Sequence, residues 1–415
     1  MAGADRRAQR LPWLVLAGAV VIQGATGPGQ TVGVSVFVDH LATDLDLSRS
    51  GVSSAYLVGT LCGALTMPAA GRLIDRRGVR FATLAFGGGF GAVLIAMSGV
   101  TGFVTLALGF AGTRILGQGA LTLTATTTVA VWFDERRGLA NGIKAAAGGA
   151  LMALVPIASA VLIRAVGWRT AWVVLGLAAW AVVLPLGVWL IRDPRTNEVE
   201  PDHHGTGTGS PIVLPSWPVA EVLRHPAFWA MTGATALAAL IGTGLMFHHI
   251  DLLTGRGLSA TQAAATFLPL TIASAAGALT AGRYADRVSP RLLTAIGLVL
   301  LGASAALVQV IGGTATAALY GAVLGIAASS IRTIEATALP RWFGIASIGQ
   351  IRGVVMAAGV GASAVGPLIV SLGLDVFGSY TPVLNVLCGT SLLLAAATLF
   401  VHPPRPRSAA PLTDR

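Results

Sequence analysis

Apolar stretches of about 20 residues, separated by short polar segments, recur along the chain. An α-helix of roughly this length crosses the hydrocarbon core of a bilayer. Because lipid offers no partners to backbone N–H and C=O groups, such a stretch must be helical. The pattern predicts an all-α integral membrane protein with twelve spans, at residues 12–38, 51–70, 81–99, 103–131, 139–163, 169–191, 227–250, 261–281, 291–311, 315–339, 354–374 and 379–401.

Composition supports this prediction and narrows the class of protein. Hydrophobic residues make up 54% of the 415 residues and charged residues only 11%, whereas soluble domains have about 25% charged residues. The formal net charge is +10, but the basic residues are dispersed between apolar stretches, so nucleic acid is not an expected partner. Cys62 and Cys388 both lie in apolar stretches and indicate no disulfide framework. The first apolar stretch is too long for a cleavable signal peptide, and we expect it to be retained.

The distribution of basic residues predicts the orientation. Of the 27 lysine and arginine residues, 20 fall in one set of connecting segments, four in the opposite set and three within the spans. Cytoplasmic segments carry the excess of positive charge. We therefore expect both termini to be cytoplasmic and the protein to lie in the plasma (inner) membrane.

The chain also contains an internal repeat. Residues 47–80 align without gaps on residues 258–291, and the segment from 131 parallels the segment from 341. Two homologous six-helix halves explain this repeat. We expect an N-terminal bundle at 1–191, a cytoplasmic linker at 192–226 and a C-terminal bundle with a short tail at 227–415. His203 and His204 lie in the linker and are interpreted as solvated residues rather than metal ligands.

A short motif occurs at the same place in both halves, between spans 2 and 3 and between spans 8 and 9. The first copy contains Gly71, Asp75 and Arg76, and the second contains Gly282, Asp286 and Arg287. The motif resembles the loop motif of the major facilitator superfamily. The resemblance implies two bundles that rock about a midplane site and expose it to each side alternately. It also implies that these six residues form a conformational latch.

Within that superfamily, four segments resemble bacterial monocarboxylate or oxalate/formate-type carriers. They are "WFDERRGLANGI" after span 4, "GWRTAW" at the start of span 6, "FHHIDLL" at the end of span 7 and "PRWFG" after span 10. The acidic signature of many monocarboxylate carriers is replaced in span 1 by "IQGATGPGQTVG". The resemblance implies a small carboxylate as cargo.

Charged residues inside the spans are candidates for function, because a cation at the bilayer centre costs roughly 2.5–3.5 kcal/mol on insertion scales. Arg114 begins a polar stripe at four-residue spacing that continues through Gln118, Thr122 and Thr126. Arg114 and Gln118 are predicted to bind substrate, since a guanidinium holds a carboxylate by two parallel hydrogen bonds. The alternative is a structural arginine bonded to backbone carbonyls and threonine hydroxyls.

Lys144 is the only lysine of the chain and lies about six residues into span 5. Arg137, Asn141, Lys144 and Gly148 share one helix face. A lysine can lose its proton when desolvated and an arginine cannot, which suits a site that handles both an anion and a proton. Lys144 is therefore predicted to bind substrate. Its long stem could instead reach back to the membrane interface.

Arg332 and Glu335 lie three residues apart in span 10, on one helix face. They are expected to neutralise each other, or to form a switch in which protonation of Glu335 frees Arg332 to bind substrate. His248, near the end of span 7, is a second candidate for proton coupling because histidine titrates near physiological pH. No phosphate-cradling loop, nucleophile elbow or metal signature occurs in the sequence.

The sequence therefore predicts a secondary active transporter of a small organic anion, coupled to protons or to a counter-anion. We expect a monomer that is not an enzyme and that needs no cofactor or metal. One alternative on the same fold is a proton-coupled exporter of hydrophobic or cationic compounds, or a carrier of a neutral solute. Another is a membrane receptor or scaffold, for which the tails and linker are short.

Overall fold

The computed structural model describes residues 2–47, 49–134, 136–193 and 217–404, and every regular element in these ranges is a helix. Three short helices are of the 3₁₀ type (η1, η2, η4) and η3 is a π-helix. The elements are α1 (Ala2–Ala25), η1 (Gly27–Gly29), α2 (Thr31–Ser35), α3 (Val38–Asp44), α4 (Arg49–Ala96), η2 (Met97–Gly99), α5 (Phe103–Thr113), η3 (Arg114–Leu121), α6 (Thr122–Trp132), α7 (Arg137–Trp189), α8 (Val219–Val222), α9 (Pro226–Phe247), α10 (His249–Thr254), α11 (Ala260–Ala265), α12 (Phe267–Ala285), α13 (Pro290–Leu307), η4 (Val308–Val310), α14 (Thr314–Phe343), α15 (Ile348–Phe377) and α16 (Thr381–Phe400).

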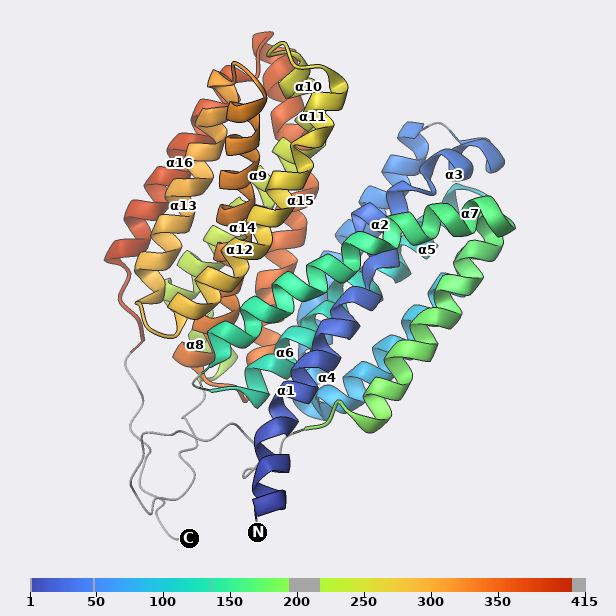
Figure 1. Ribbon diagram of the computed structural model, residues 1–415, viewed down its shortest axis with the longest axis vertical. Coiled ribbons are helices and arrows are strands. Elements are labelled where there is room, and N and C mark those ends of the chain that lie inside the picture. The colour runs from blue at the N-terminus through green and yellow to red at the C-terminus, as the bar shows by residue number, and fades with distance from the viewer. Residues whose placement is uncertain (1, 48, 135, 194–216, 405–415) are drawn as a thin grey trace.

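Within the described ranges, eight helical stretches are long and apolar enough to cross a membrane. Two of them, Ser54–Gly99 and Arg137–Trp189, contain 46 and 53 residues, about twice what one crossing needs. Each contains a glycine in the left-handed region, Gly78 with φ 80° and Gly167 with φ 78°, where other residues are strained. The helical backbone angles are interrupted at these glycines, and the ribbons of α4 and α7 each fold back (Figure 1), so each stretch is a pair of antiparallel helices. The protein is thus a multi-pass membrane protein, and the count of twelve spans stays a prediction.

Three predicted spans differ in detail from the helices observed. The span at 12–38 is interrupted after Ala25, where Pro28 has no N–H to continue the helix. The span at 261–281 is split between α11 and α12, because Pro269 cannot donate to the carbonyl of Ala265. Helix α15 begins at Ile348 rather than near residue 354, so Arg352 belongs to a helix and not to a connecting loop.

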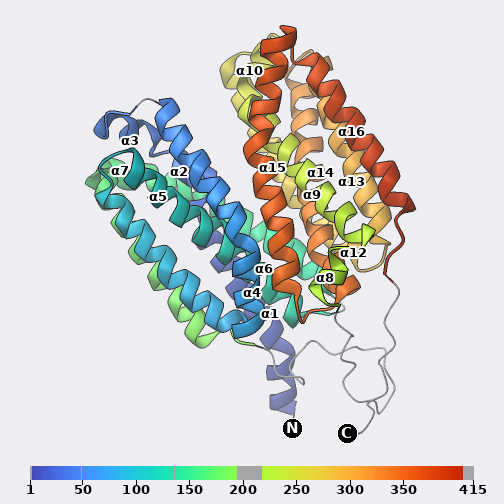
Figure 2. The same cartoon turned by 180° about the vertical axis from the view of Figure 1, so that it is seen from behind.

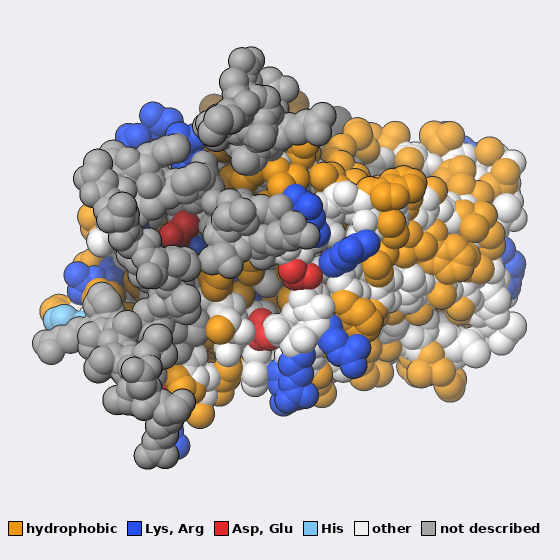
Figure 3. Space-filling view, turned by 90° about the horizontal axis from the view of Figure 1, so that it is seen from below, with side chains coloured by type: hydrophobic (Ala, Val, Ile, Leu, Met, Phe, Trp, Pro, Cys, Tyr) orange, Lys and Arg blue, Asp and Glu red, His pale blue; other side chains and the backbone are white. Residues whose placement is uncertain are grey.

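The helices form two bundles that meet at the end where the chain termini lie and diverge toward the opposite end (Figures 1 and 2). One bundle comprises α1–α7 and the other α9–α16. Each has its own hydrophobic core, with members from Val15 to Ile191 in the first and from Ala234 to Ala395 in the second. Seen from the end of the termini, basic side chains lie around this end and hydrophobic ones extend along the flank (Figure 3).

Candidate functional site

The two bundles contact each other mainly through two helix pairs, α4 with α15 and α7 with α12. We call these paired contacts the gate. At the first pair, the Asp75 carboxylate of α4 accepts hydrogen bonds from the backbone N–H groups of Gly349 and Gln350, both at 2.7 Å. These groups are at the start of α15, where helical N–H groups have no partner in their own helix. Asp75 therefore caps a helix of the opposite bundle.

The second pair repeats this arrangement with the bundles exchanged. The Asp286 carboxylate, at the end of α12, accepts from the backbone N–H groups of Gly138 at 2.8 Å and Leu139 at 3.2 Å. Both N–H groups are in the first turn of α7. The positive end of each helix dipole thus faces a carboxylate of the other bundle.

The motif glycines permit the close backbone approach at the gate. A methyl group on Gly71 would overlap the carbonyl oxygen of Gly349, and one on Gly282 would overlap the carbonyl oxygen of Gly138. The arginines of the motif behave differently. Arg76 and Arg287 are exposed, and their side chains make no hydrogen bond or ion pair within the described ranges.

Burial changes the acidity of the two gate carboxyls, which lie between spans. It raises the pKa of Asp75 from 3.8 to about 6, against the opposing effect of the hydrogen bonds from Gln350 and Gly349. Burial also raises the pKa of Asp286, against the hydrogen bonds from Gly138 and Leu139. Opening the gate would return both groups to water.

Arg114 is buried in the first bundle, where α5 passes into the π-helix η3. Its guanidinium carbon lies 4.8 Å from the centre of the Tyr56 ring, and Nη1 donates to the carbonyl oxygen of Gly29 at 3.5 Å. The Nε atom of Arg114 and Oε1 of Gln118 are buried and have no hydrogen-bond partner among the described residues. Arg114 therefore has unused hydrogen-bonding capacity, while the cation–π contact with Tyr56 holds its guanidinium in position.

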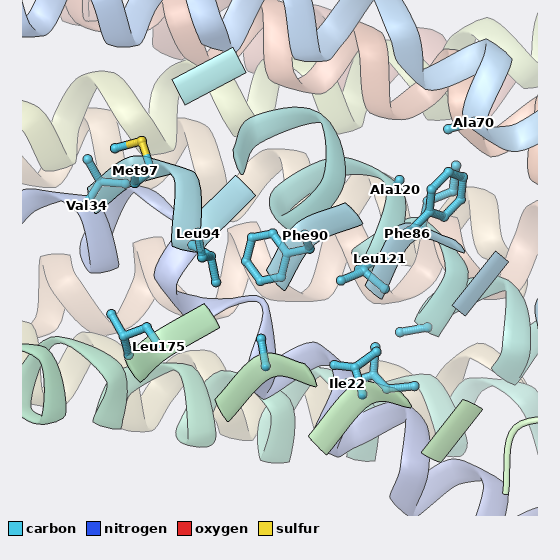
Figure 4. Packing of buried hydrophobic residues seen from close by; sticks show 14 of the residues in the cluster. Ile22, Val34, Ala70, Phe86, Phe90, Leu94, Met97, Ala120, Leu121 and Leu175 are labelled. Carbon is cyan, nitrogen blue, oxygen red and sulfur yellow. The ribbon is translucent and has the colours of Figure 1, made fainter. Parts of the chain in front are cut away.

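The ring of Phe90, in the core of the first bundle, packs against Gly29 and Gly117, which lie close to Arg114. A methyl group on Gly29 or Gly117 would collide with the Phe90 ring. Figure 4 shows Phe90 between Leu94 and Leu121 in the same cluster. Small residues at positions 29 and 117 thus let the broken helix of the first span and η3 pack on one aromatic ring.

Lys144 is 8% exposed and donates from Nζ to Oγ1 of Thr126 at 2.5 Å. Thr126 is the last member of the polar stripe predicted from the sequence. The ammonium group therefore lies inside the protein and does not reach back toward the end of the helix. Lys144 also interacts electrostatically with Arg352, Glu335 and Arg332 of the other bundle.

Glu335 pairs with Arg352 and not with Arg332, which corrects the pairing expected from the sequence. Arg352 Nη2 lies 3.4 Å from Glu335 Oε2, and both side chains are about 6% exposed. Arg332 is exposed on α14, and its side chain makes no hydrogen bond or ion pair in the part of the chain that the structure describes. Its charge also acts on Lys144 of the other bundle. We call Lys144, Arg332, Glu335 and Arg352 the inner cluster.

Arg352 is not among the site residues predicted from the sequence, because the predicted span 11 starts at residue 354 and leaves Arg352 in a connecting loop. A helix beginning at Ile348 puts Arg352 in its second turn, beside the preceding helix α14. The presence of Glu335 within a span already indicated that a partner was needed, because a buried acid requires a basic group nearby. Arg352 is the second arginine after Glu335 along the chain, following Arg341.

Arg114 and the inner cluster lie at different depths. Thr126, which binds Lys144, is twelve residues beyond Arg114 along the same helical run, or roughly 18 Å at 1.5 Å per residue. The guanidinium of Arg114 points the other way, since its Tyr56 partner packs against Phe110. One small carboxylate therefore cannot contact Arg114 and Lys144 together.

The outer histidines are held within the second bundle. His248 Nε2 lies 3.1 Å from the carbonyl oxygen of Pro367 in α15, and its ring is 5.7 Å from that of Tyr380. His249 is fully buried and its Nε2 lies 2.6 Å from Oγ1 of Thr266. No cluster of three or more potential metal ligands occurs among the residues described, and His203 and His204 lie outside them.

Comparisons with known proteins agree with this architecture. A model of the Major Facilitator Superfamily matches residues 14–320 and 256–415. Human monocarboxylate transporter 11 is 26% identical, covering 95% of this chain and 83% of its own. An MFS-type efflux pump of Mycolicibacterium smegmatis is 26% identical, covering 72% of this chain and 70% of its own. An oxalate:formate antiporter of Oxalobacter formigenes is 25% identical, covering 59% of this chain and 56% of its own.

Among solved structures, the human organic anion transporter MFSD10 has the same fold. The TM-score is 0.69, and the match covers 94% of this chain and 99% of the other at 17% identity. At that identity the likeness concerns the fold alone.

Proposed function

Since this chain belongs to the Major Facilitator Superfamily, whose members carry small molecules and are not enzymes, we propose that it moves a small organic anion across the plasma membrane. The cargo would be a mono- or dicarboxylate, carried by alternating access and coupled to protons or to a counter-anion. Both termini would be cytoplasmic, and the carrier would work as a monomer.

The observation that carries this proposal is the excess of positive charge in the inner cluster. This cluster contains three basic side chains from both bundles and one acid, and neither the buried Lys144 nor Arg332 forms an ion pair among the described residues. Unpaired charge away from bulk water is costly, and an anionic ligand reduces the cost. Because the bases come from both bundles, a bound anion would contact both sides of the moving interface.

The names of three similar proteins also indicate an anionic cargo. They are a monocarboxylate transporter, an oxalate:formate antiporter and, by fold alone, an organic anion transporter. We propose that Lys144 and Arg332 bind the carboxylate and that Glu335 or His248 carries the proton. Arg114 and Gln118 are proposed to contact the substrate at an outer level of the same path.

The gate supports a mechanism of alternating access. With the termini in the cytoplasm, the structure represents the arrangement closed on the cytoplasmic side. Asp75 and Asp286 would stabilise this arrangement through the capped helices, with Gly71 and Gly282 allowing the contact. Arg76 and Arg287 complete the proposed latch from the solvent side.

Uptake into proteoliposomes tests the proposal. The purified protein should take up at least one member of a radiolabelled panel of formate, oxalate, pyruvate and lactate, with and without a pH gradient. Lys144→Ala should raise the KM roughly tenfold, because a hydrogen bond to a charged group contributes about 1.5–3 kcal/mol. Arg256→Ala, which changes an exposed arginine outside the proposed site and latch, serves as the control for handling and insertion. Unchanged uptake by the Lys144→Ala protein would contradict the proposal.

An exporter of hydrophobic or cationic compounds, or a carrier of a neutral solute, is the second candidate. The similarity to an MFS-type efflux pump favours it. A carrier of cations would use an unpaired acid inside the membrane. Glu335 is the only acid within the predicted spans and pairs with Arg352. Thermal stabilisation by bulky organic cations, and not by carboxylates, would favour this candidate.

A further inference from the structure

The ion pair between Glu335 and Arg352 is only partly formed. Arg352 Nη2 and Glu335 Oε2 are 3.4 Å apart, and Arg352 Nη1 donates to the carbonyl oxygen of Ala336 at 3.2 Å. Glu335 Oε1 and Arg352 Nε are buried and have no hydrogen-bond partner within the described ranges. Arginine and carboxylate can form two parallel bonds, but this pair forms one long bond.

Two charged groups, both basic, interact with Glu335. The groups that interact with it are Arg352 on α15 and Lys144 on α7 of the other bundle. Helices α6 and α9, which also contact α14, contain no charged residue, and α12 and α13 have Arg283 and Arg291 only near their loop ends. No second acid therefore faces Glu335 from these helices. Helix α4, which packs against α15, carries Asp75, but its carboxylate is bonded to the backbone N–H groups of Gly349 and Gln350.

We propose that Arg352 is a substrate-binding arginine that Glu335 holds until it takes up a proton, so that the carrier is a proton–anion symporter. This proposal rests on the proposed function and names its coupling. A proton from the aqueous phase binds the unpartnered Oε1 of Glu335 and gives a neutral carboxylic acid. The ion pair is lost, and the guanidinium of Arg352 is free to bind the carboxylate of the cargo.

The charges balance at each step. With Glu335 ionised, the inner cluster has three positive groups and one negative group. Protonation leaves three positive groups, and one monocarboxylate restores the original net charge. When the cargo leaves, Arg352 pairs again with Glu335, which loses its proton to water. One proton therefore accompanies one monocarboxylate in each cycle.

Arg332 cannot have this role, because Glu335 does not hold it. It contributes positive charge whatever the protonation state of Glu335. The distinction matters for pH dependence. Removing Arg332 should weaken anion binding at every pH, whereas removing Arg352 should also abolish the dependence of binding on protonation.

The first test needs no cargo. Phenylglyoxal modifies free guanidinium groups, and mass spectrometry measures the modified fraction of each arginine. In the full-length protein, Glu335→Gln should increase modification of Arg352 severalfold relative to wild type at the same pH, with exposed Arg76 as the internal reference. Equal modification of Arg352 in the two proteins would refute its release.

The second test uses radiolabelled pyruvate and oxalate in proteoliposomes. Glu335→Gln should keep exchange of internal for external carboxylate but lose uptake driven by a pH gradient. Arg352→Gln should raise the KM roughly tenfold, and Arg352→Lys should recover part of the affinity. Uptake by Glu335→Gln that still follows the pH gradient would overturn this coupling and leave the anion carrier intact. Absence of carboxylate uptake by the wild type would instead overturn the proposed function.

Discussion

Gly349 at the gate offers a test of how the bundles are held closed. A methyl group added there would lie 2.6 Å from Oδ1 of Asp75 and 2.6 Å from the carbonyl oxygen of Gly71. Ordinary van der Waals contact begins at 3.4 Å, so each distance is 0.8 Å too short. Because one of these atoms belongs to the backbone, helices α4 and α15 must move apart.

The energy of that movement can be estimated from the structure. A separation of 0.8 Å would stretch both 2.7 Å bonds of Asp75 to about 3.5 Å, beyond the usual limit for N–H···O bonds. Each bond contributes about 1 kcal/mol, and overpacking costs typically 1–3 kcal/mol. Gly349→Ala should therefore destabilise the closed gate by roughly 3 kcal/mol, which is a factor of about 100 in the equilibrium between closed and open.

Distances between spin labels on α4 and α15 at the end of the termini measure this equilibrium. Gly349→Ala should shift the distance distribution to the longer, open population. Gly361→Ala is the matched control, since Gly361 is in the same helix and a methyl group there meets nothing within 4 Å. An unchanged distribution for Gly349→Ala, or the same shift for Gly361→Ala, would refute the steric argument.

Two further predictions concern protons and the depth of the charged groups. The pKa of Asp75 is about 6 in the closed gate and 3.8 for an ordinary aspartate, so the closed state binds a proton more tightly than the open state. Protonation thus stabilises the closed gate, fully below pH 3.8 and progressively less as the pH rises through 6. The same spin-label distances should show a larger closed fraction at pH 5 than at pH 7, a difference that Asp75→Asn removes; a closed fraction that grows with pH would contradict this sign. Because Thr126, which binds Lys144, lies roughly 18 Å from Arg114 along their helical run, the effects of Arg114→Gln and Lys144→Ala on the free energy of carboxylate binding should add within about 0.5 kcal/mol. A strong coupling in this double-mutant cycle, measured by equilibrium binding, would show that one anion contacts both residues.

The class of protein and most of its helical plan follow from the amino-acid order alone. Apolar stretches of the length of a bilayer crossing leave the backbone only the helix, because lipid cannot replace hydrogen bonds. The repeated motif around Asp75 and Asp286 indicated two related halves, and the resemblance to the superfamily is confirmed by the family match. The sequence also marked the stripe from Arg114 to Thr126 and, separately, the single lysine, and the structure joins the two because Lys144 donates to Thr126.

Only the tertiary structure decided which charges meet. Spacing along one helix favoured a pair of Arg332 with Glu335, but packing of α14 against α15 brings Arg352 to Glu335 instead. The motif likewise marked Asp75 as part of a latch, but only helix packing shows that its carboxylate accepts from the backbone N–H groups of Gly349, 274 residues later, and Gln350. The physical reason is the same in both cases. Sequence periodicity fixes the face of a helix, while a buried charge takes the partner that neighbouring helices place within reach, and that placement depends on where each helix begins and on glycines that let backbones touch.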